Sequence, residues 1–187
     1  MGIGHHVIHS TAIIDAKAEV PESVSVGPHS VIDAGVALGQ GCVIGPHVHL
    51  TGQTTIGKNN TFHTGAVMGD APQDLKYDGA PTRLRIGDEN IFREHVTLNR
   101  SNSLEEDTVI GSHNFFMAHS HVGHNTVVGD HNIFANAALL GGHVVVGDHV
   151  FISAYCGVHQ FVRVGSLSMM QGHSGASKDV PPFTMVS

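Results

Sequence analysis

An apolar residue recurs at every sixth position along nearly the whole chain. Counted from Ile8 in steps of six, 27 of 28 positions are apolar when Ala80 is included, whereas a composition of 41% apolar residues would give about 11. A helix has a period near 3.6 and a strand a period of 2, so a period of six predicts short strands separated by turns. Three hexapeptides form one triangular coil, and residues 18 apart then stack about 4.8 Å above each other. The period therefore predicts an all-β fold, a parallel β-helix.

Glycine follows the apolar residue at 12 of these 28 positions, as at Gly111 and Gly129. Glycine tolerates positive φ and leaves room where the chain bends sharply, so these residues are expected at the corners of the coil. The period does not set the hand of the coil, for which the crossover rule alone would favour the right-handed form.

Two segments interrupt the repeat. Residues 69–85 put Asp74 on the apolar position and contain two prolines, so they predict an external loop. Residues 100–108 keep Leu104 on the apolar position but end in acidic residues, and they predict a second loop. Residues 1–187 are otherwise expected to form one β-helical domain. Long loops on a regular scaffold are common sites of function.

The charge and the hydropathy of the chain argue against two classes of protein. The sequence has 9 Lys plus Arg against 16 Asp plus Glu, a formal net charge of -7, without a run of like charge. A nucleic-acid surface needs a basic footprint, so we expect no nucleic-acid partner. No stretch of about 18 apolar residues occurs, and residues 1–6 lack the charged and apolar regions of a signal peptide. We therefore expect a cytoplasmic protein without membrane insertion.

Seventeen histidines are many for 187 residues. Most, including His131 and His149, are expected on corners and faces as solvated polar residues. One group differs, because a step of 18 puts His124, Gly142 and Gln160 in one column. Imidazoles beside a free glycine backbone suit general-base chemistry with an adjacent oxyanion donor. The histidines expected beside or just before this column are His119, His121, His143 and His159.

Five of the nine basic residues are concentrated around the first loop. Guanidinium and ammonium groups bind phosphate, so the cluster is expected to contact a phosphate or an acidic partner, although it would also fit a loop merely lined with charge. The cluster consists of Lys76, Arg83, Arg85, Arg93 and Arg100, and Arg163 is a further candidate contact.

Several motifs occur in the order seen in a known enzyme family. They are residues 73–77 (Gln-Asp-Leu-Lys-Tyr), 79–83, 96–100, 116–124, 138–144 and 157–161 (Gly-Val-His-Gln-Phe). These motifs resemble those of the UDP-N-acetylglucosamine acyltransferases that open lipid A biosynthesis, over essentially the whole chain. A hexapeptide repeat is shared by many acyltransferases, whereas the 73–77 loop together with the His-Gln-Phe motif is specific.

The resemblance implies a left-handed β-helix that forms a homotrimer, with active sites between neighbouring subunits. It implies transfer of a 3-hydroxyacyl chain from acyl carrier protein to the 3-hydroxyl of UDP-N-acetylglucosamine, with acyl carrier protein as co-substrate and without cofactor or metal. His124 matches the general base of the family, and the Gly142 N–H matches its oxyanion donor. The basic cluster would suit an acidic carrier protein. The residues that match contacts to the sugar, the diphosphate or the thioester arm are Asp74, Lys76, His121, His143, His159 and Gln160.

The sequence departs from the family pattern at several places. Asn125 follows the expected base where an acidic residue often stands, and an amide orients an imidazole without stabilising its protonated form by charge. Asn99 stands where some members have histidine, and the segment after Arg100 lacks a common glycine-rich stretch. The sequence stops at Ser187, where the family adds a helical C-terminal domain, so we expect that domain to be absent. The sequence is then either a shortened form of a longer chain or a naturally short relative that binds the nucleotide more weakly.

Three other functions fit parts of the sequence. The same transfer onto a 3-amino nucleotide sugar would give an amide, and the sequence does not separate this product from an ester. A β-helical carbonic anhydrase would need three zinc-binding histidines across a subunit interface; His119 and His124 have the required spacing, but Arg83 stands at the third position. A non-catalytic β-helix used for binding or assembly is the remaining alternative.

Overall fold

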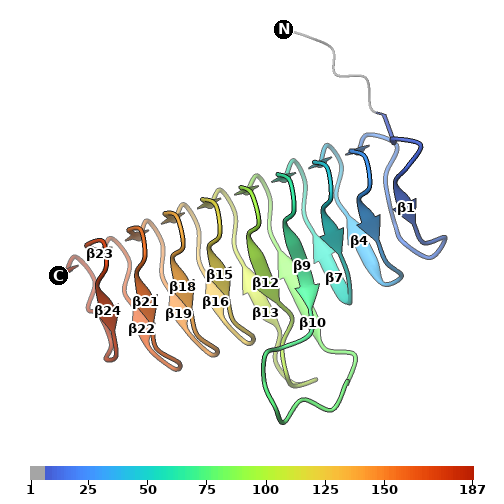
Figure 1. The fold of residues 1–187 in the computed structure, drawn as a ribbon. Helices are drawn as coiled ribbons and strands as arrows, with labels where there is room; N and C mark the ends of the chain where they lie inside the picture. The colour runs from blue at the N-terminus through green and yellow to red at the C-terminus, as the bar shows by residue number, and fades with distance from the viewer. Residues whose placement is uncertain (1–6) are drawn as a thin grey trace, which may run out of the picture.

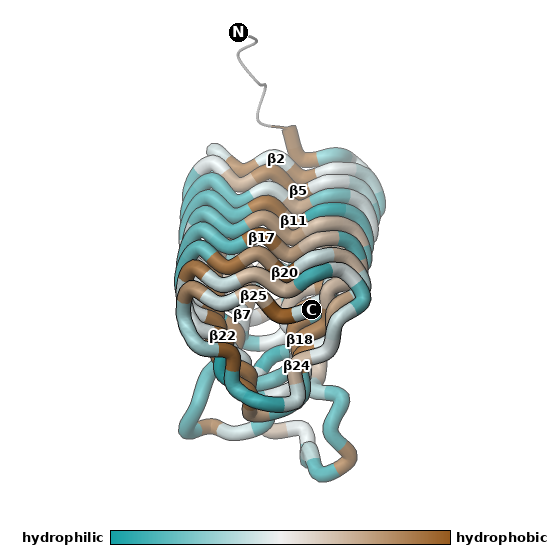
Figure 2. The backbone as a smooth tube through the Cα atoms, turned by 90° about the vertical axis from the view of Figure 1, so that its left-hand side faces the viewer, coloured by the Kyte–Doolittle hydropathy of each residue, from teal (hydrophilic) through white to brown (hydrophobic). Residues whose placement is uncertain are grey.

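The computed structural model of the chain describes residues 7–187, so the expectation about residues 1–6 lies outside the described part. The strands of the described part are parallel and form three sheets along one axis, and no helix there is long and apolar enough to cross a membrane. Figure 1 shows the stacked coils from the side, and Figure 2 shows them from the end that carries the C-terminus. The predicted all-β parallel β-helix is confirmed.

Successive strands along the chain belong to successive sheets, so each full coil has three short strands. Sheet 1 consists of β1 (Ile13–Ile14), β3 (Val31–Ile32), β6 (His49–Leu50), β9 (Val67–Asp70), β12 (Thr97–Asn99), β15 (His121–Val122), β18 (Leu139–Leu140), β21 (Gly157–Val158) and β24 (Gly175–Ala176). Sheet 2 consists of β4 (Val36–Leu38), β7 (Gln53–Ile56), β10 (Arg83–Ile86), β13 (Thr108–Ile110), β16 (Val127–Val128), β19 (Val145–Val146) and β22 (Arg163–Val164). Sheet 3 consists of β2 (Ser25–Val26), β5 (Val43–Ile44), β8 (Thr61–Phe62), β11 (Ile91–Phe92), β14 (Phe115–Phe116), β17 (Ile133–Phe134), β20 (Phe151–Ile152), β23 (Met169–Met170) and β25 (Met185–Val186).

The inward residues of the repeat form one continuous core. They are the apolar residues of the six-residue period, and nearly all of them are buried. Four phenylalanines of sheet 3 stack with ring centroids 5.0, 5.0 and 4.5 Å apart, close to the spacing of parallel strands. The stacked residues are Phe62, Phe92, Phe116 and Phe134.

The predicted glycines lie at the corners of the coil, but the positive φ angles occur at other corner residues, many of them histidine or asparagine. Among the glycines that follow the apolar residue in the described chain, only Gly69 has a positive φ. The others are needed for space, because a Cβ on Gly129 would lie 2.9 Å from the Gly147 carbonyl oxygen of the next coil. Positive φ occurs two residues later, at residues such as His113 (φ 59°) and His131 (φ 58°). Histidine and asparagine are among the residues that tolerate this conformation best, which explains much of the high histidine content.

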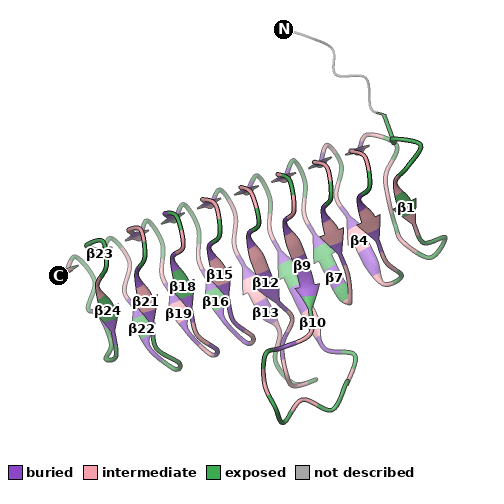
Figure 3. Cartoon of the chain, in the orientation of Figure 1, coloured by how far each residue is buried: buried purple, intermediate pink, exposed green. Residues whose placement is uncertain are grey.

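Two loops leave the coil between sheet 1 and sheet 2. Residues 71–82 connect β9 to β10, and residues 100–107 connect β12 to β13 (Figures 1 and 3). The first is shorter than the predicted 69–85, because β9 continues to Asp70 and β10 begins at Arg83. Leu104 keeps the apolar position only in sequence, since it lies on the second loop with 52% of its surface exposed.

The loops lengthen the sequence separation between stacked residues but keep the apolar positions in the same six-residue register. Most partners are 18 residues apart, but Ile56 pairs with Ile86, 30 residues on, and Ile86 pairs with Ile110, 24 residues on. Both steps exceed 18 by a multiple of six. The apolar positions after the loops therefore continue the count that began before them.

Candidate active site

The column predicted from the step of 18 lies at the corner between sheets 1 and 2, on the side where both loops leave the coil. His124 follows β15, Gly142 follows β18 and Gln160 follows β21, each at the same position of its coil. The register is fixed by backbone hydrogen bonds, from the His143 N–H to the His124 carbonyl and from the Phe161 N–H to the Gly142 carbonyl. The three residues therefore stack as expected.

The His124 imidazole lies directly over the Gly142 backbone. A Cβ built on Gly142 would be 2.7 Å from both Cε1 and Nε2 of His124, so the ring occupies the space that a side chain would take. Among the described residues, the Gly142 N–H donates no backbone–backbone hydrogen bond. A basic nitrogen and an unused amide donor thus lie side by side, which is the arrangement that acyl transfer requires.

Asn125 determines which nitrogen of His124 carries the proton. Its Oδ1 lies 2.9 Å from His124 Nδ1, and the same oxygen accepts a hydrogen bond from the Asn102 backbone N–H at 2.9 Å. An oxygen that accepts from one N–H is oriented to accept from the other, so Nδ1 carries hydrogen and Nε2 is left unprotonated in the neutral ring. In this tautomer Nε2, which lies over Gly142, is the ring nitrogen with a free lone pair.

A hollow of about 550 Å³ opens between this corner and the first loop. Asp74 lies on its wall, where hydrogen bonds from the Lys76 backbone N–H (3.0 Å) and Asn102 Nδ2 (2.9 Å) lower the pKa of the Asp74 carboxyl below its ordinary value. The side chains that line the hollow include both hydrogen-bond donors and acceptors. The lining residues are Gln73, Asp74, Leu75, Lys76, Asn102, His124, His143, Gln160 and Phe161.

His143 lies next to the base. Its ring meets the His124 ring edge-on, with centroids 5.2 Å apart, and stacks on Phe161 at 4.7 Å. Burial, followed by the nearby His124, lowers the pKa of His143 below its ordinary value. Its Nδ1 is 3.7 Å from Oε2 of Glu106. His143 is thus held between an imidazole, an aromatic ring and a carboxylate.

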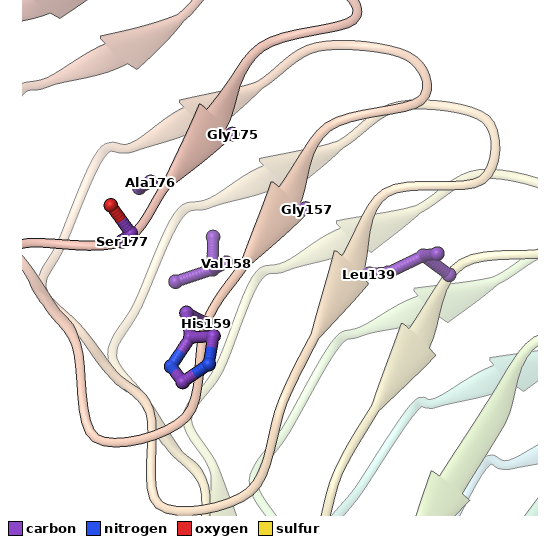
Figure 4. A pocket seen from close by; sticks show the side chains of 7 residues that line it. All are labelled: Leu139, Gly157, Val158, His159, Gly175, Ala176 and Ser177. Carbon is purple, nitrogen blue, oxygen red and sulfur yellow. The ribbon is translucent and has the colours of Figure 1, made fainter.

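His159 and His121 face a different side of the coil. His159 is exposed and lines a second hollow of about 400 Å³, shown in Figure 4. His121 lies on the outward face of sheet 1, where Thr97 Oγ1 is 2.8 Å from its Nδ1 and where burial lowers its pKa. Its strand partner Leu139 also lines the second hollow. The residues around this hollow are Leu139, Gly157, Val158, His159, Gly175, Ala176 and Ser177.

The basic cluster is largely occupied by contacts within the chain. Nε of Arg83 and Nε of Arg85 each lie 2.5 Å from a different oxygen of Asp107 on the second loop. Arg93 pairs with its neighbour Glu94 at 2.9 Å, at the corner that follows sheet 3. These three guanidinium groups do not converge on the hollow beside His124.

Arg100 supports the first loop, whereas the side chains of Lys76 and Arg163 form no salt bridge within the described residues. The Arg100 guanidinium donates to the Gly69 carbonyl at 2.8 Å and to the Tyr77 hydroxyl at 3.2 and 3.3 Å. Lys76 lines the hollow beside His124, and Arg163 lines an adjoining hollow with His143. Positive charge near the candidate site comes from these two residues.

Three residues that contact the candidate side chains were not themselves sequence candidates: Asn102, Glu106 and Phe161. Asn102 and Glu106 lie on the second loop, where no periodicity relates a residue to the coil. Phe161 was accessible to the sequence argument, because it lies 18 residues after His143 and stacks on it. His119, which entered the zinc alternative, lies at the preceding corner and stacks on His95 at 5.2 Å. No group of three His, Cys, Asp or Glu side chains within residues 7–187 is arranged to hold a metal ion.

Known proteins resemble this chain over almost its full length, although no family model matches it. An acyl-[acyl-carrier-protein]–UDP-N-acetylglucosamine O-acyltransferase of Xanthomonas euvesicatoria is 51% identical over 181 residues, which are 96% of this chain and 69% of the relative. A protein with the same description from Herminiimonas arsenicoxydans is 47% identical over 178 residues, 95% of this chain and 68% of the relative. The crystal structure of the UDP-N-acetylglucosamine O-acyltransferase of Moraxella catarrhalis matches with a TM-score of 0.93 at 40% identity, over 95% of this chain and 70% of that one.

A hexapeptide β-helix with an imidazole over a free glycine amide defines an acyltransferase of the left-handed β-helix class. The hand inferred from the resemblance is thereby confirmed. The chain belongs to the acyl-[acyl-carrier-protein]–UDP-N-acetylglucosamine O-acyltransferase family, and it spans 68–69% of the two relatives described above. This membership favours the ester-forming reaction over the amide, the zinc enzyme and the non-catalytic alternative.

Proposed function

We propose that this chain transfers a 3-hydroxyacyl group from acyl carrier protein to the 3-hydroxyl of UDP-N-acetylglucosamine, with His124 as the general base. The observation that supports the proposal is the position of the His124 ring over the free Gly142 amide, with Asn125 Oδ1 2.9 Å from His124 Nδ1. The names of the relatives supply the donor and the acceptor.

The proposed reaction needs one base and one oxyanion donor. His124 Nε2 takes the proton of the sugar hydroxyl while the hydroxyl oxygen forms a bond to the thioester carbonyl carbon. The carbonyl oxygen becomes an oxyanion that accepts a hydrogen bond from the Gly142 N–H. When the carbon–sulfur bond breaks, the carrier thiolate leaves and receives the proton from the imidazolium, so the base is restored.

The two hollows suit the two parts of the substrates. Asp74 and Gln160 line the polar hollow beside His124 and are proposed to bind the sugar hydroxyls. Lys76 and Arg163 supply the positive charge proposed to receive the diphosphate or the acidic carrier protein. The second hollow is lined mainly by apolar and glycine residues and is proposed to hold the acyl chain, with His159 at its edge.

We further propose that the chain works as a cytoplasmic homotrimer. His121 lies on the outward face of sheet 1 and His159 directly follows β21 of that sheet, where both are proposed to contribute to a site shared with a neighbouring subunit. Glycine at 157 leaves the outward face open there, because a Cβ at this position would meet no atom within 4 Å. A groove between subunits is thus the proposed path of the acyl chain.

The test is transfer of a radiolabelled 3-hydroxyacyl group from acyl carrier protein to UDP-N-acetylglucosamine. We expect transfer by the wild type and a loss of about 10²- to 10⁴-fold in His124→Ala, which is the usual value of a general base. His131→Asn is the matched control, because it changes a histidine of another corner to a residue that tolerates positive φ. Absence of transfer by a folded wild type would contradict the proposal, and transfer to a 3-amino analogue alone would replace the ester by an amide.

A further inference from the structure

A chain of polar contacts leads from His124 to the second loop. His124 Nδ1 contacts Asn125 Oδ1 at 2.9 Å, and Asn125 Nδ2 donates to Glu106 Oε2 at 3.0 Å. Asn125 is 95% buried, with a relative exposure of 5%, whereas the side chain of Glu106 is 62% exposed. A buried amide therefore connects the candidate base to a carboxylate at the surface.

The contacts of Asn125 are satisfied in only one orientation of its amide. Its oxygen accepts from the Asn102 backbone N–H and from His124 Nδ1, and its nitrogen faces a carboxylate that can only accept. A flipped amide would point its NH₂ group at the Asn102 N–H and its oxygen at the carboxylate. Both of these contacts are repulsive, so Glu106 and Asn102 together hold the oxygen toward His124.

This orientation decides the state of the base. With an amide oxygen beside Nδ1, the neutral ring carries its hydrogen on Nδ1 and leaves Nε2 free above Gly142. If the amide rotated, its NH₂ group would favour hydrogen on Nε2 instead, and the ring could not take a proton from a hydroxyl there. The charged and titratable groups that surround His124 are Asp74 and Lys76 on the first loop, His143 on the next coil and Glu106 on the second loop.

We propose that Glu106 is a positioning residue, which acts through Asn125 to keep His124 in the tautomer that serves as a base; this inference rests on the proposed function. The carboxylate also supplies negative charge for the imidazolium that forms during transfer. The Asn125 side chain separates the Glu106 carboxylate from His124. The carboxylate therefore remains hydrated, while a neutral amide occupies the buried position next to the base. The second loop thus provides the acidic group that is missing at Asn125.

The first experiment compares Glu106→Ala, Glu106→Gln and Glu105→Ala in the transfer assay. We expect Glu106→Ala to lower kcat about tenfold with KM changed less than about twofold, since the coupling of neighbouring groups is usually worth 2- to 150-fold. Glu106→Gln keeps an acceptor oxygen and should recover part of the loss. Glu105 is an exposed neighbour whose side chain makes none of these contacts, so Glu105→Ala should match the wild type. Equal rates in all three variants would overturn the proposal.

A second variant tests the route through Asn125. Asn125→Asp puts a carboxylate directly beside His124 Nδ1, so Glu106 should become dispensable. We expect Glu106→Ala to change kcat less than about twofold in the Asn125→Asp background, against about tenfold in the wild type. Equal losses in both backgrounds would show that Glu106 acts independently of Asn125 and would refute the positioning role.

The tautomer of His124 gives a readout that does not depend on turnover. Nitrogen NMR of the ring should report hydrogen on Nδ1 in the wild type and in Glu105→Ala, and a mixture of tautomers in Glu106→Ala. An unchanged tautomer in Glu106→Ala would overturn the inference even if the wild type transfers the acyl group. A wild type that fails to transfer but shows the expected tautomers would instead remove the proposed function while supporting the structural role of Glu106.

Discussion

Two corners of the same coil use the same kinds of residue for different purposes. The corner between sheets 2 and 3 repeats its residues from coil to coil, as in Gly-Asp-His-Asn at 129–132 and Gly-Asp-His-Val at 147–150. The corner between sheets 1 and 2 varies at its two middle positions, with Gly-His-Asn-Thr at 123–126, Gly-Gly-His-Val at 141–144 and His-Gln-Phe-Val at 159–162. The first corner is regular, and the second carries the candidate active site.

The regular corner is a set of ladders. The His131 ring stacks between His113 and His149 at 4.7 and 4.9 Å, and the Asp130 N–H donates to Asp148 Oδ1 at 2.8 Å. Like residues at like positions contact each other from coil to coil, so most of their polar groups have a partner within the ladder. At the other corner, His124 stands above a glycine and turns its edge toward His143 at 88°. The comparison teaches that chemistry is found where the repeat of residue type breaks while the repeat of backbone continues.

The largest expected effect tests the regular corner. Asn114 is buried, donates to Asn90 Oδ1 and to the Gly129 carbonyl, and accepts from the Asn132 N–H. Asn114→Ala would leave the Gly129 carbonyl and the Asn132 N–H without partners in the interior, which should cost about 3 kcal/mol of unfolding free energy. Urea unfolding at fixed protein concentration measures the cost. Acyl transfer per folded molecule should stay within about twofold of the wild type, and a loss of transfer without loss of stability would reverse the assignment of the two corners.

Next in size is the pair Gly142→Ala and Gly129→Ala. The Cβ at 142 would displace the His124 ring, so we expect transfer to fall about 30-fold while the unfolding free energy changes by less than about 1 kcal/mol. The Cβ at 129 would instead meet backbone of the next coil, so Gly129→Ala should cost about 1–3 kcal/mol of stability and leave transfer per folded molecule nearly unchanged. Similar losses of transfer in both variants would remove the distinction between the corners.

The smallest expected effect concerns the second loop and depends on pH. Burial raises the pKa of Asp107, but hydrogen bonds from Arg85 and Arg83 outweigh it and hold the pKa below the ordinary value of 3.8. A carboxyl whose pKa is lower in the folded state stabilises the fold above its unfolded pKa, and the contribution is lost as the pH falls through its folded pKa. We expect about 1 kcal/mol in the wild type at neutral pH.

Chemical unfolding from pH 6 down to about pH 2.5 checks this contribution. The wild type should lose stability below about pH 4, and Asp107→Asn should lack that part of the decline. Asp78→Asn on the first loop controls for the change in net charge, because its side chain contacts only a backbone N–H. A decline of equal size in Asp107→Asn would show that the two arginines do not stabilise the loop through this carboxylate.

The fold and the central pair of the site follow from one number in the sequence. His124, Gly142 and Gln160 lie after both loops, where the step is 18 without interruption, so their stacking could be predicted. The contacts of Asp74 with Asn102 and of Asn125 with Glu106 could not, because loop residues have no fixed position relative to the coil.

The basic residues are a second case in which contacts with a loop could not be predicted from the period. Arg83 and Arg85 are predicted to contact phosphate, but both pair with Asp107, which lies on a loop whose path the period does not describe. The positive-φ positions also differ from the prediction, because histidine and asparagine occupy many of them, whereas most glycines after the apolar residue are needed for space. The six-residue period predicts which residues stack, but it does not predict which polar side chains form hydrogen bonds or salt bridges.

Stacked residues on either side of the two loops are 30 and 24 residues apart, and both separations are multiples of six. This length rule affects how a β-helix can gain a loop. An insertion of six or twelve residues leaves the apolar positions of all other coils in register. Both insertions lie at the corner between sheets 1 and 2. A repeat unit can therefore be extruded from the stack and remodelled while the pairing of the remaining coils is untouched. The loops at 71–82 and 100–107 therefore bring side chains of their own to the candidate site without disturbing the register of the coils.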